Sequence, residues 1–273
     1  MLLKGLIGSS HPLPSLAVAI FATVVSAACG RSAAGCVLVA ATVLTGQLSI
    51  GWCNDLVDRD RDRIAGRTDK PLTSGAVPTR VVTTACALAV ACCVPLSFAS
   101  GWRAASAHLA GVAGGWAYDL GLKRTVWSWL PYAVSFGLLA AFITLGLPGH
   151  PAPPWWMVAA GALLGTGAHF LNVVPDVEQD LAAGVRGLPQ RLGAVRSAVV
   201  GAGLLALASV VVTLGAGEPP WWAWAGLLLA VGAAAAAGLV GARGGSRRTP
   251  FLLAILTAGL AVALLVGRAP HLG

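Results

Sequence analysis

The sequence is poor in charge. Only 10% of its 273 residues are Asp, Glu, Lys or Arg, whereas 57% are hydrophobic and the mean hydropathy is +0.80. So few charged groups cannot cover the surface of a water-soluble fold of this size, which excludes a soluble globular protein. The sequence also lacks a Gly/Ser-rich linker, a low-complexity tail or a shift in composition. We therefore expect a single membrane domain over residues 1–273.

The six cysteines lack the paired spacing of a zinc site or a disulfide framework. All of them lie within apolar runs or at the ends of such runs. Cysteine in this setting behaves as a small apolar side chain. We therefore expect neither zinc nor structural disulfides.

Long apolar runs are what the sequence has in abundance. A membrane-spanning helix takes roughly 17–25 mostly apolar residues, and polar breaks separate nine runs of about this length. The predicted runs are Leu13–Cys29, Ser32–Cys53, Val77–Ser100, Ala104–Tyr118, Trp129–Pro148, Trp155–Pro175, Ala194–Gly215, Pro219–Gly241 and Pro250–Gly267. The sequence thus predicts an all-α integral membrane protein with about nine transmembrane helices.

The basic residues are distributed unevenly between the loops of this arrangement. With a cytoplasmic N-terminus, 15 of the 18 Lys and Arg residues fall on the cytoplasmic side, and only Arg31, Arg103 and Arg268 fall outside. Short cytoplasmic loops of membrane proteins carry such an excess. We therefore expect the N-terminus to be cytoplasmic, in the cell (plasma) membrane. The net charge of +8 does not indicate nucleic-acid binding, because the basic residues are spread among separate loops.

Acidic residues are scarcer still, and they are concentrated. Nine of the ten lie in three predicted cytoplasmic loops, and only Glu218 lies elsewhere. Carboxylates packed together repel by roughly 4 kcal/mol per pair at 4 Å in a partly protein-like dielectric. We therefore expect a positive group to neutralise them.

The first acidic cluster has helical spacing. If the second run continues inward as a helix, Asn54, Asp58 and Asp62 follow each other at four-residue intervals on one face, with Asp55 beside them. Three or four oxygen-bearing side chains then lie together at the cytoplasmic end of the helix.

A second cluster repeats the pattern. Asp176 and Asp180 are four residues apart, Asn172 lies one turn earlier, and Glu178 lies between the two aspartates. Oxygen ligands without His or Cys suit Mg²⁺, which shares its remaining sites with phosphates and water. The two clusters therefore predict a magnesium–diphosphate clamp. Four basic residues in the same loops are candidates to bind the diphosphate oxygens. They are Arg67, Lys70, Lys123 and Arg124.

Two further residues near the clusters have more than one interpretation. Tyr118 ends an apolar run, where tyrosine serves either as an interface anchor or as part of the site. His169 lies within a run, seven residues before Asp176. A histidine at such a position commonly forms a hydrogen bond between helices, and its role stays open.

These motifs resemble those of the UbiA superfamily of intramembrane prenyltransferases. Residues 54–62, NDLVDRDRD, are similar to the NDxxDxxxD motif of that superfamily, and residues 67–75, RTDKPLTSG, are similar to its continuation. Residues 176–180, DVEQD, with 187–193, GLPQRLG, resemble its second motif. The pair Tyr118 and Lys123 is a looser counterpart of a Tyr-x-x-x-Lys motif, with one additional residue between them.

The resemblance implies a nine-helix bundle around a central cavity open to lipid. It implies Mg²⁺ ions that tie the diphosphate of a prenyl donor to Asn54, Asp58 and Asp62 on one side and to Asp176 and Asp180 on the other. The four aspartates would then be catalytic. Departure of diphosphate would leave an allylic carbocation, which an aromatic or other small or lipophilic acceptor attacks.

Three alternatives remain at the level of sequence. A terpene cyclase on the same scaffold would carry the same aspartate motifs. A CDP-alcohol phosphotransferase is disfavoured, because its D-G-x-x-A-R opening is absent from the sequence. A non-enzymatic transporter is disfavoured because transporters keep ionisable groups near the bilayer midplane, whereas these acids lie at the predicted inner rim.

Overall fold

Long helices make up the fold. The computed structural model describes residues 2–244 and 248–268, and these contain no strand. The long helices are α2 (Pro12–Ala28), α3 (Ala33–Ile64), α4 (Thr79–Phe98), α5 (Trp102–Leu120), α6 (Leu130–Leu145), α7 (Trp155–Val173), α10 (Ala194–Gly215), α11 (Trp221–Arg243) and α12 (Thr249–Arg268). The short ones are α1 (Leu2–Gly8), η1 (Leu122–Arg124), η2 (Val174–Asp176), α8 (Val177–Ala182) and α9 (Leu188–Leu192).

Each predicted apolar run coincides with one long helix, but the helices differ in their capacity to span a membrane. Within the described part of the chain, six are long and apolar enough to do so: α3, α4, α7 extended to Ala182, α10, α11 and α12. A seventh span results if α1 and α2, which are bent by 63° relative to each other, count as one. The apolar helix α6 is shorter, at 16 residues. An integral membrane protein with six or seven such spans is therefore supported.

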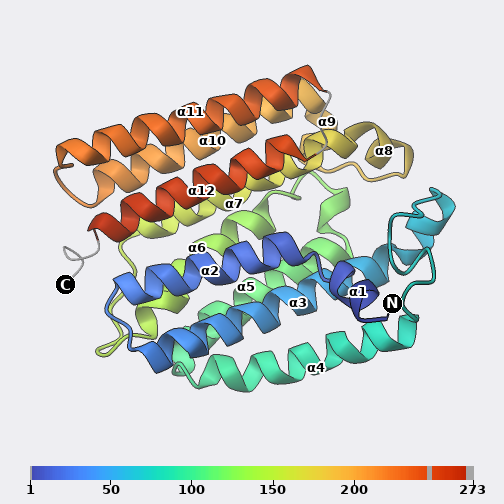
Figure 1. Cartoon of the computed structure of the whole chain (residues 1–273), viewed down its shortest axis with the longest axis horizontal. Coiled ribbons are helices and arrows are strands. Elements are labelled where there is room, and N and C mark those ends of the chain that lie inside the picture. Colours follow the sequence, from blue (N-terminus) through green and yellow to red (C-terminus); the bar gives the residue numbers. More distant parts are fainter. Residues whose placement is uncertain (1, 245–247, 269–273) are drawn as a thin grey trace.

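The helices run side by side along the long axis of the molecule (Figure 1). Helices α7, α10, α11 and α12 lie along one side, and α2 to α5 lie along the other. The C-terminal end of α3 lies at the same end of the bundle as α8 and α9, whereas the end of α12 lies at the opposite end. The two aspartate clusters, more than a hundred residues apart in sequence, thus meet at one end. Of the basic residues assigned to this end from sequence, Arg247 lies outside the described residues.

Small residues allow the helices to approach closely. A Cβ atom added at Gly167 of α7 would lie 2.9 Å from the carbonyl oxygen of Gly201 of α10. A Cβ atom added at Gly201 would in turn lie 3.0 Å from the carbonyl oxygen of Gly167. Helices in lipid associate through such packing because apolar side chains gain little by leaving the hydrocarbon. The close α7–α10 contact fixes the helix that leads into the second cluster.

Candidate active site

The first aspartate cluster lies on a continuous helix, as the sequence predicts. Helix α3 extends to Ile64, eleven residues beyond the apolar run that ends at Cys53. Asp55, Asp58 and Asp62 are nearly inaccessible to solvent, with side-chain exposed fractions of 2%, 5% and 8%. Since a buried carboxylate is costly unless it is paired, their neighbours decide what the cluster can bind.

Asp58 is held by two cations. Its Oδ2 atom accepts hydrogen bonds from Nη2 of Arg61 and from Nζ of Lys123, both at 2.8 Å. Its Oδ1 atom is buried, and no residue in the described part of the chain donates a hydrogen bond to it. Lys123 reaches this position because α5 ends at Leu120 and the chain turns through η1, which also accommodates the additional residue between Tyr118 and Lys123. Its neighbour Arg124 is exposed.

Asp55 ties the segment between α1 and α2 to the site. Its Oδ1 atom accepts a hydrogen bond from Nζ of Lys70 at 2.7 Å and lies 3.0 Å from Nε2 of His11. Its Oδ2 atom is buried and has no hydrogen-bond partner among residues 2–244 and 248–268. Lys70, a predicted diphosphate ligand, is thus paired with a carboxylate, and His11 joins the site from 44 residues away.

Asn54 contacts a third acidic residue. Its Nδ2 atom donates a hydrogen bond of 2.8 Å to Oδ1 of Asp119, at the end of α5. Asp119 is 2% exposed, and its Oδ2 atom is buried without a hydrogen-bond partner. The first cluster therefore includes a carboxylate from a neighbouring helix.

The second cluster departs from continuous helical spacing. Pro175 interrupts the chain after α7, so Asn172 lies on α7, Asp176 on η2 and Asp180 on α8. Proline removes a helical hydrogen bond and clashes with the preceding turn, which explains the break. Oδ2 of Asp180 accepts a hydrogen bond of 2.9 Å from Nε2 of the buried Gln190. Glu178 is exposed.

The two clusters end in the same backbone motif. At the first, the amide of Arg67 bonds to the carbonyl of Asp62 and the amide of Gly66 bonds to the carbonyl of Arg63. At the second, the amides of Val185 and Gly184 bond in the same way to the carbonyls of Asp180 and Leu181. These are Schellman motifs, closed by glycines with φ of +68° and +78°. Each therefore fixes the last aspartate of its cluster three residues before the helix cap.

Arginines link the clusters electrostatically. Arg61 interacts with Asp180 as well as with Asp58, and Arg67 interacts with both Asp62 and Asp176. Arg67 also donates two hydrogen bonds to Asp69, at 3.0 and 3.1 Å. The guanidinium of Arg67 holds the pKa of the exposed Asp69 carboxyl below its usual value. The positive charges of Arg61 and Arg67 thus offset part of the repulsion between the two groups of acids.

The donor atoms fit magnesium in chemistry, although their arrangement is not that of a formed metal centre. Nowhere in residues 2–244 and 248–268 do three or more His, Cys, Asp or Glu side chains converge closely enough to hold a metal ion. Buried oxygens without a partner are nevertheless present on Asp55, Asp58 and Asp119. Mg²⁺ prefers carboxylate and amide oxygens, which both clusters supply. The cations of Arg61, Lys70 and Lys123 neutralise part of the acidic charge in this arrangement.

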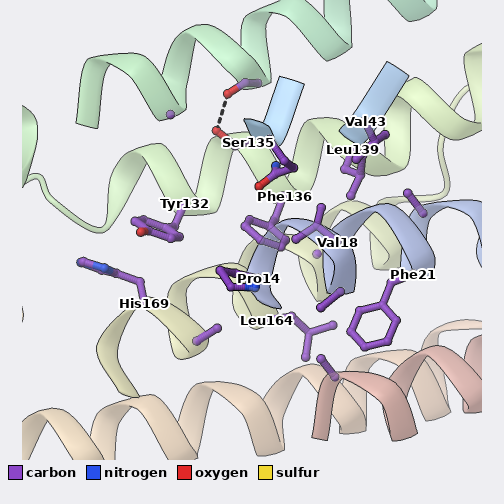
Figure 2. Close-up of a pocket in the computed structure, with 18 of the residues that line it drawn as sticks. Pro14, Val18, Phe21, Val43, Tyr132, Ser135, Phe136, Leu139, Leu164 and His169 are labelled. Atoms are coloured by element: carbon purple, nitrogen blue, oxygen red, sulfur yellow. Dashed lines mark hydrogen bonds between the residues drawn. The ribbon is translucent and has the colours of Figure 1, made fainter. Parts of the chain in front are cut away.

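An apolar cavity of about 540 Å³ opens beside the clusters. Its lining comes from α2, α3, α5, α6, α7, α10 and α12. The polar lining residues next to the clusters are His11, Asn54, Tyr118, Asp119 and Asn172. Figure 2 shows Tyr132 and His169 together at one end of the cavity and Phe21 and Val43 at the other. A charged rim therefore leads into a hydrocarbon-lined space.

Three rings pack against one another in the cavity wall. The rings of Tyr132 and His169 are stacked, with centroids 4.3 Å apart and planes 16° apart. Tyr118 meets both rings edge-on, at 5.1 Å from Tyr132 and 5.4 Å from His169. Tyr118 is thus part of the cavity wall rather than only an anchor at the membrane interface.

Several residues of the rim were not anticipated from sequence as site residues. They are His11, Arg61, Asp119 and Gln190. Arg61 follows Asp58 by three residues on the same helix, so helical spacing could have predicted its place in the site. Gln190 lies within the GLPQRLG segment that marks the second motif. His11 carries no local signal, because its contact with Asp55 depends on the bend between α1 and α2.

The chain matches known proteins in both sequence and fold. The model of the UbiA prenyltransferase family matches residues 15–260. The bacteriochlorophyll synthase 33 kDa chain of Cereibacter sphaeroides is 31% identical over 186 residues, which cover 62% of this chain and 59% of the relative. The alignment therefore spans less than two thirds of the length of that curated relative.

Solved structures show the same fold. A UbiA homologue from Aeropyrum pernix K1 in its apo form has a TM-score of 0.76 at 20% identity, with 93% of this chain and 97% of that chain covered. A UbiA homologue from Archaeoglobus fulgidus bound to GPP and Mg²⁺ has a TM-score of 0.70 at 19% identity, with 96% and 99% covered. The family match over nearly the whole chain, on this shared fold, shows that the chain belongs to the UbiA prenyltransferase family.

Proposed function

We propose that the chain is a Mg²⁺-dependent intramembrane prenyltransferase. It moves an isoprenyl group from a prenyl diphosphate to an aromatic or other small or lipophilic acceptor and releases diphosphate. One observation carries the proposal: buried carboxylates with unpartnered oxygens lie next to an apolar cavity, and one of them, Asp119, lines it. A prenyl diphosphate has a highly charged head and a hydrocarbon tail, so it matches both parts. The homologue structure with bound GPP and Mg²⁺ supports this choice of donor and ion.

Asn54, Asp58 and Asp62 would hold magnesium on one side of the diphosphate, and Asp176 and Asp180 would hold it on the other. When bound, the ion neutralises charge that develops on the departing diphosphate. The four aspartates are in this sense the proposed catalytic residues. Asp55 contacts Lys70 and His11 through its Oδ1 atom and thereby supports the rim, and its Oδ2 atom is left for a further ligand of the site.

Basic residues complete the binding of the diphosphate. Arg67, Lys70, Lys123 and Arg124 are the proposed ligands of its oxygens, and Arg61 joins them because it pairs with Asp58 and acts electrostatically on Asp180. Hydrogen bonds from such cations to phosphate oxygens are charge-assisted and strong. The diphosphate would compete with Asp58 for Lys123, and an Asp58 oxygen released in this way would be available to the metal.

The cavity separates the reacting carbon from water. Its lining is largely apolar along Phe21, Val43 and Leu139, so the tail is buried and an allylic cation is protected from hydrolysis. We place all nine long helices in the membrane around this lipid-open cavity, with the N-terminus and both aspartate clusters on the cytoplasmic side of the plasma membrane. Reporter fusions at Thr68 and Gly149 test this topology, and finding both on one side of the membrane would refute it.

The activity is tested with membranes that contain the purified chain, Mg²⁺ and geranylgeranyl diphosphate. Asp58→Asn and Asp180→Asn are expected to abolish Mg²⁺-dependent release of diphosphate while the protein stays folded. The matched control is Asp60→Asn on the same helix, because Asp60 is exposed and forms its ion pair with its neighbour Arg59. If both site variants release diphosphate as fast as the wild type, the proposed clamp is refuted. Cyclic hydrocarbon products without an acceptor would instead identify a terpene cyclase.

A further inference from the structure

Asp119 is a buried carboxylate that has no role in the proposed clamp. It lies in the last turn of α5 and is 2% exposed. The C-terminal end of a helix carries a partial negative charge, which disfavours an acid there. Within residues 2–244 and 248–268, no Lys, Arg or His side chain forms an ion pair with it. Because a buried charge in such a position is costly, its hydrogen bonding should explain why it is there.

The hydrogen bond between Asp119 and Asn54 fixes the direction of an amide. Oδ1 of Asp119 accepts a hydrogen bond of 2.8 Å from Nδ2 of Asn54. A carboxylate can only accept hydrogen bonds, so the NH₂ group of the amide must face Asp119 and the carbonyl group must face away from it. The partner of Asn54 thus selects one of the two arrangements that an amide side chain can adopt.

The other end of this amide, Oδ1 of Asn54, is free to bind a ligand. No donor in the described part of the chain forms a hydrogen bond with it. In contrast to Oδ2 of Asp119, it is not sealed from solvent, and Asn54 is half-buried and lines the cavity. Amide oxygens are suitable ligands for Mg²⁺. The orientation that Asp119 imposes therefore leaves an accessible metal-binding oxygen.

The end of α5 is held against α3 by two further contacts. Nε1 of Trp116 donates a hydrogen bond of 3.2 Å to Oγ of Ser49. Just beyond the helix, Nζ of Lys123 donates one of 2.8 Å to Oδ2 of Asp58. Asp119 lies between these two contacts in sequence, so its position along α3 is fixed from both sides. Its carboxylate is therefore a rigid acceptor for an amide on α3.

We propose that Asp119 is a positioning residue of the metal site, which holds the Asn54 amide with its carbonyl oxygen available to Mg²⁺. The inference rests on the proposed Mg²⁺-dependent function. Asp119 acts through Asn54 and does not itself touch the reacting groups. The same pairing explains why an asparagine heads a cluster of aspartates. A carboxylate at position 54 would face the carboxylate of Asp119 and could not donate a hydrogen bond to it.

Binding of Mg²⁺ without turnover tests this role. The purified chain is unfolded thermally in detergent with inorganic diphosphate, and the Mg²⁺ concentration that gives half of the stabilisation is measured. Asp119→Asn and Asp119→Leu lose the same charge, but only asparagine keeps an oxygen that accepts from Asn54. Contacts that orient a metal ligand contribute a factor of about 10–100. The half-maximal Mg²⁺ concentration of Asp119→Leu should therefore exceed that of Asp119→Asn by about tenfold or more. Equal values would show an effect of charge alone and would overturn the proposal.

A second measurement determines whether the effect passes through Asn54. Asn54→Ala removes the carbonyl oxygen and should raise the half-maximal Mg²⁺ concentration of the wild type by about tenfold or more. In the Asp119→Leu background the amide is no longer oriented, so the same substitution should add less than about threefold. A merely structural role of Asp119 would lower the unfolding temperature without Mg²⁺ but would not produce this coupling. Effects that multiply independently would contradict the positioning role.

An exchanged pair provides the decision if Asp119→Leu does not accumulate. Asn54→Asp combined with Asp119→Asn keeps the net charge and the hydrogen bond between an amide and a carboxylate, with the donor now on α5. Its half-maximal Mg²⁺ concentration is expected to lie within about threefold of the wild-type value. A larger rise would mean that the pairing does not position the ligand, and the proposal would fall.

The matched control applies the same two substitutions to Asp60, which is exposed on α3 in the segment of the first cluster. Asp60→Asn and Asp60→Leu are expected to give equal half-maximal Mg²⁺ concentrations. A difference as large as that between the two Asp119 variants would overturn the assignment. If the wild type shows neither stabilisation by Mg²⁺ and diphosphate nor Mg²⁺-dependent release of diphosphate, the proposed function itself is contradicted, and the role of Asp119 with it.

Discussion

Lys123 and Asp58 form a buried ion pair across two helices. Nζ of Lys123 lies 2.8 Å from Oδ2 of Asp58, and the two side chains are 4% and 5% exposed. Removing one partner of such a pair leaves an uncompensated charge in the interior, which commonly costs 3–5 kcal/mol. The pair therefore couples the position of the loop after α5 to the first aspartate cluster. Lys123, which is proposed to bind the diphosphate, thus also holds Asp58, which is proposed to bind the metal.

The coupling predicts a non-additive effect on stability. Lys123→Met leaves Asp58 with Arg61 alone, and Asp58→Asn leaves Lys123 facing an amide, so each single change is expected to lower the free energy of unfolding by about 2 kcal/mol. The double variant should lose at least about 1 kcal/mol less than the sum. Thermal unfolding of the detergent-purified chain measures the cycle. Strict additivity would contradict the buried pair.

The first cluster was predictable because its geometry is local. Four-residue spacing places Asn54, Asp58 and Asp62 on one helical face, and α3 extends through all three. The same argument did not anticipate the break at Pro175, because this proline is the last residue of the predicted apolar run that begins at Trp155. It also could not find the Asn54–Asp119 hydrogen bond, which joins residues 65 positions apart. The shape of the cavity could not be predicted from the sequence either, because its lining comes from seven helices.

A second prediction concerns the partner of Asp180. Gln190 is buried and donates to Oδ2 of Asp180, so Gln190→Ala frees the carboxylate to turn. Residues that orient metal ligands typically contribute a factor of 10–100 to affinity or activity. We expect the Mg²⁺ concentration for half-maximal diphosphate release to rise by about tenfold. Gln179→Ala is the matched control, because Gln179 is exposed on α8. Equal effects of the two substitutions would refute a positioning role for Gln190.

The glycines that close the two Schellman motifs predict a third outcome. Gly66 and Gly184 have φ of +68° and +78°, and no atom lies within 4 Å of an added Cβ. Alanine at either position therefore meets only backbone strain, of about 1–2 kcal/mol. Gly203→Ala is the opposite case, because this glycine lies inside α10 with open space around it. It is expected to stabilise the fold by up to about 1 kcal/mol.

Thermal unfolding and diphosphate release, measured on the same variants, separate the effect of each substitution on stability from its effect on activity. Asp62 and Asp180 lie three residues before the caps that these glycines follow, so Gly66→Ala and Gly184→Ala should reduce activity as well as stability. If these variants lose the predicted free energy of unfolding but release diphosphate at the wild-type rate, the caps do not position the aspartates.

The last prediction concerns the length of the donor. Ala258 of α12 lines the cavity, and near it Phe21 lies 3.7 Å from a Cβ added at Gly259. Ala258→Phe fills the space through which a long tail would pass. Each excluded CH₂ group forfeits about 0.8 kcal/mol of burial, and every 1.4 kcal/mol is a factor of ten. The ratio of kcat/KM for geranylgeranyl over geranyl diphosphate should thus fall at least tenfold. Leu256→Phe, on the exposed face of the same helix, should leave this ratio unchanged. A fall of equal size for both donors in Ala258→Phe would mean that the tail does not extend along α12.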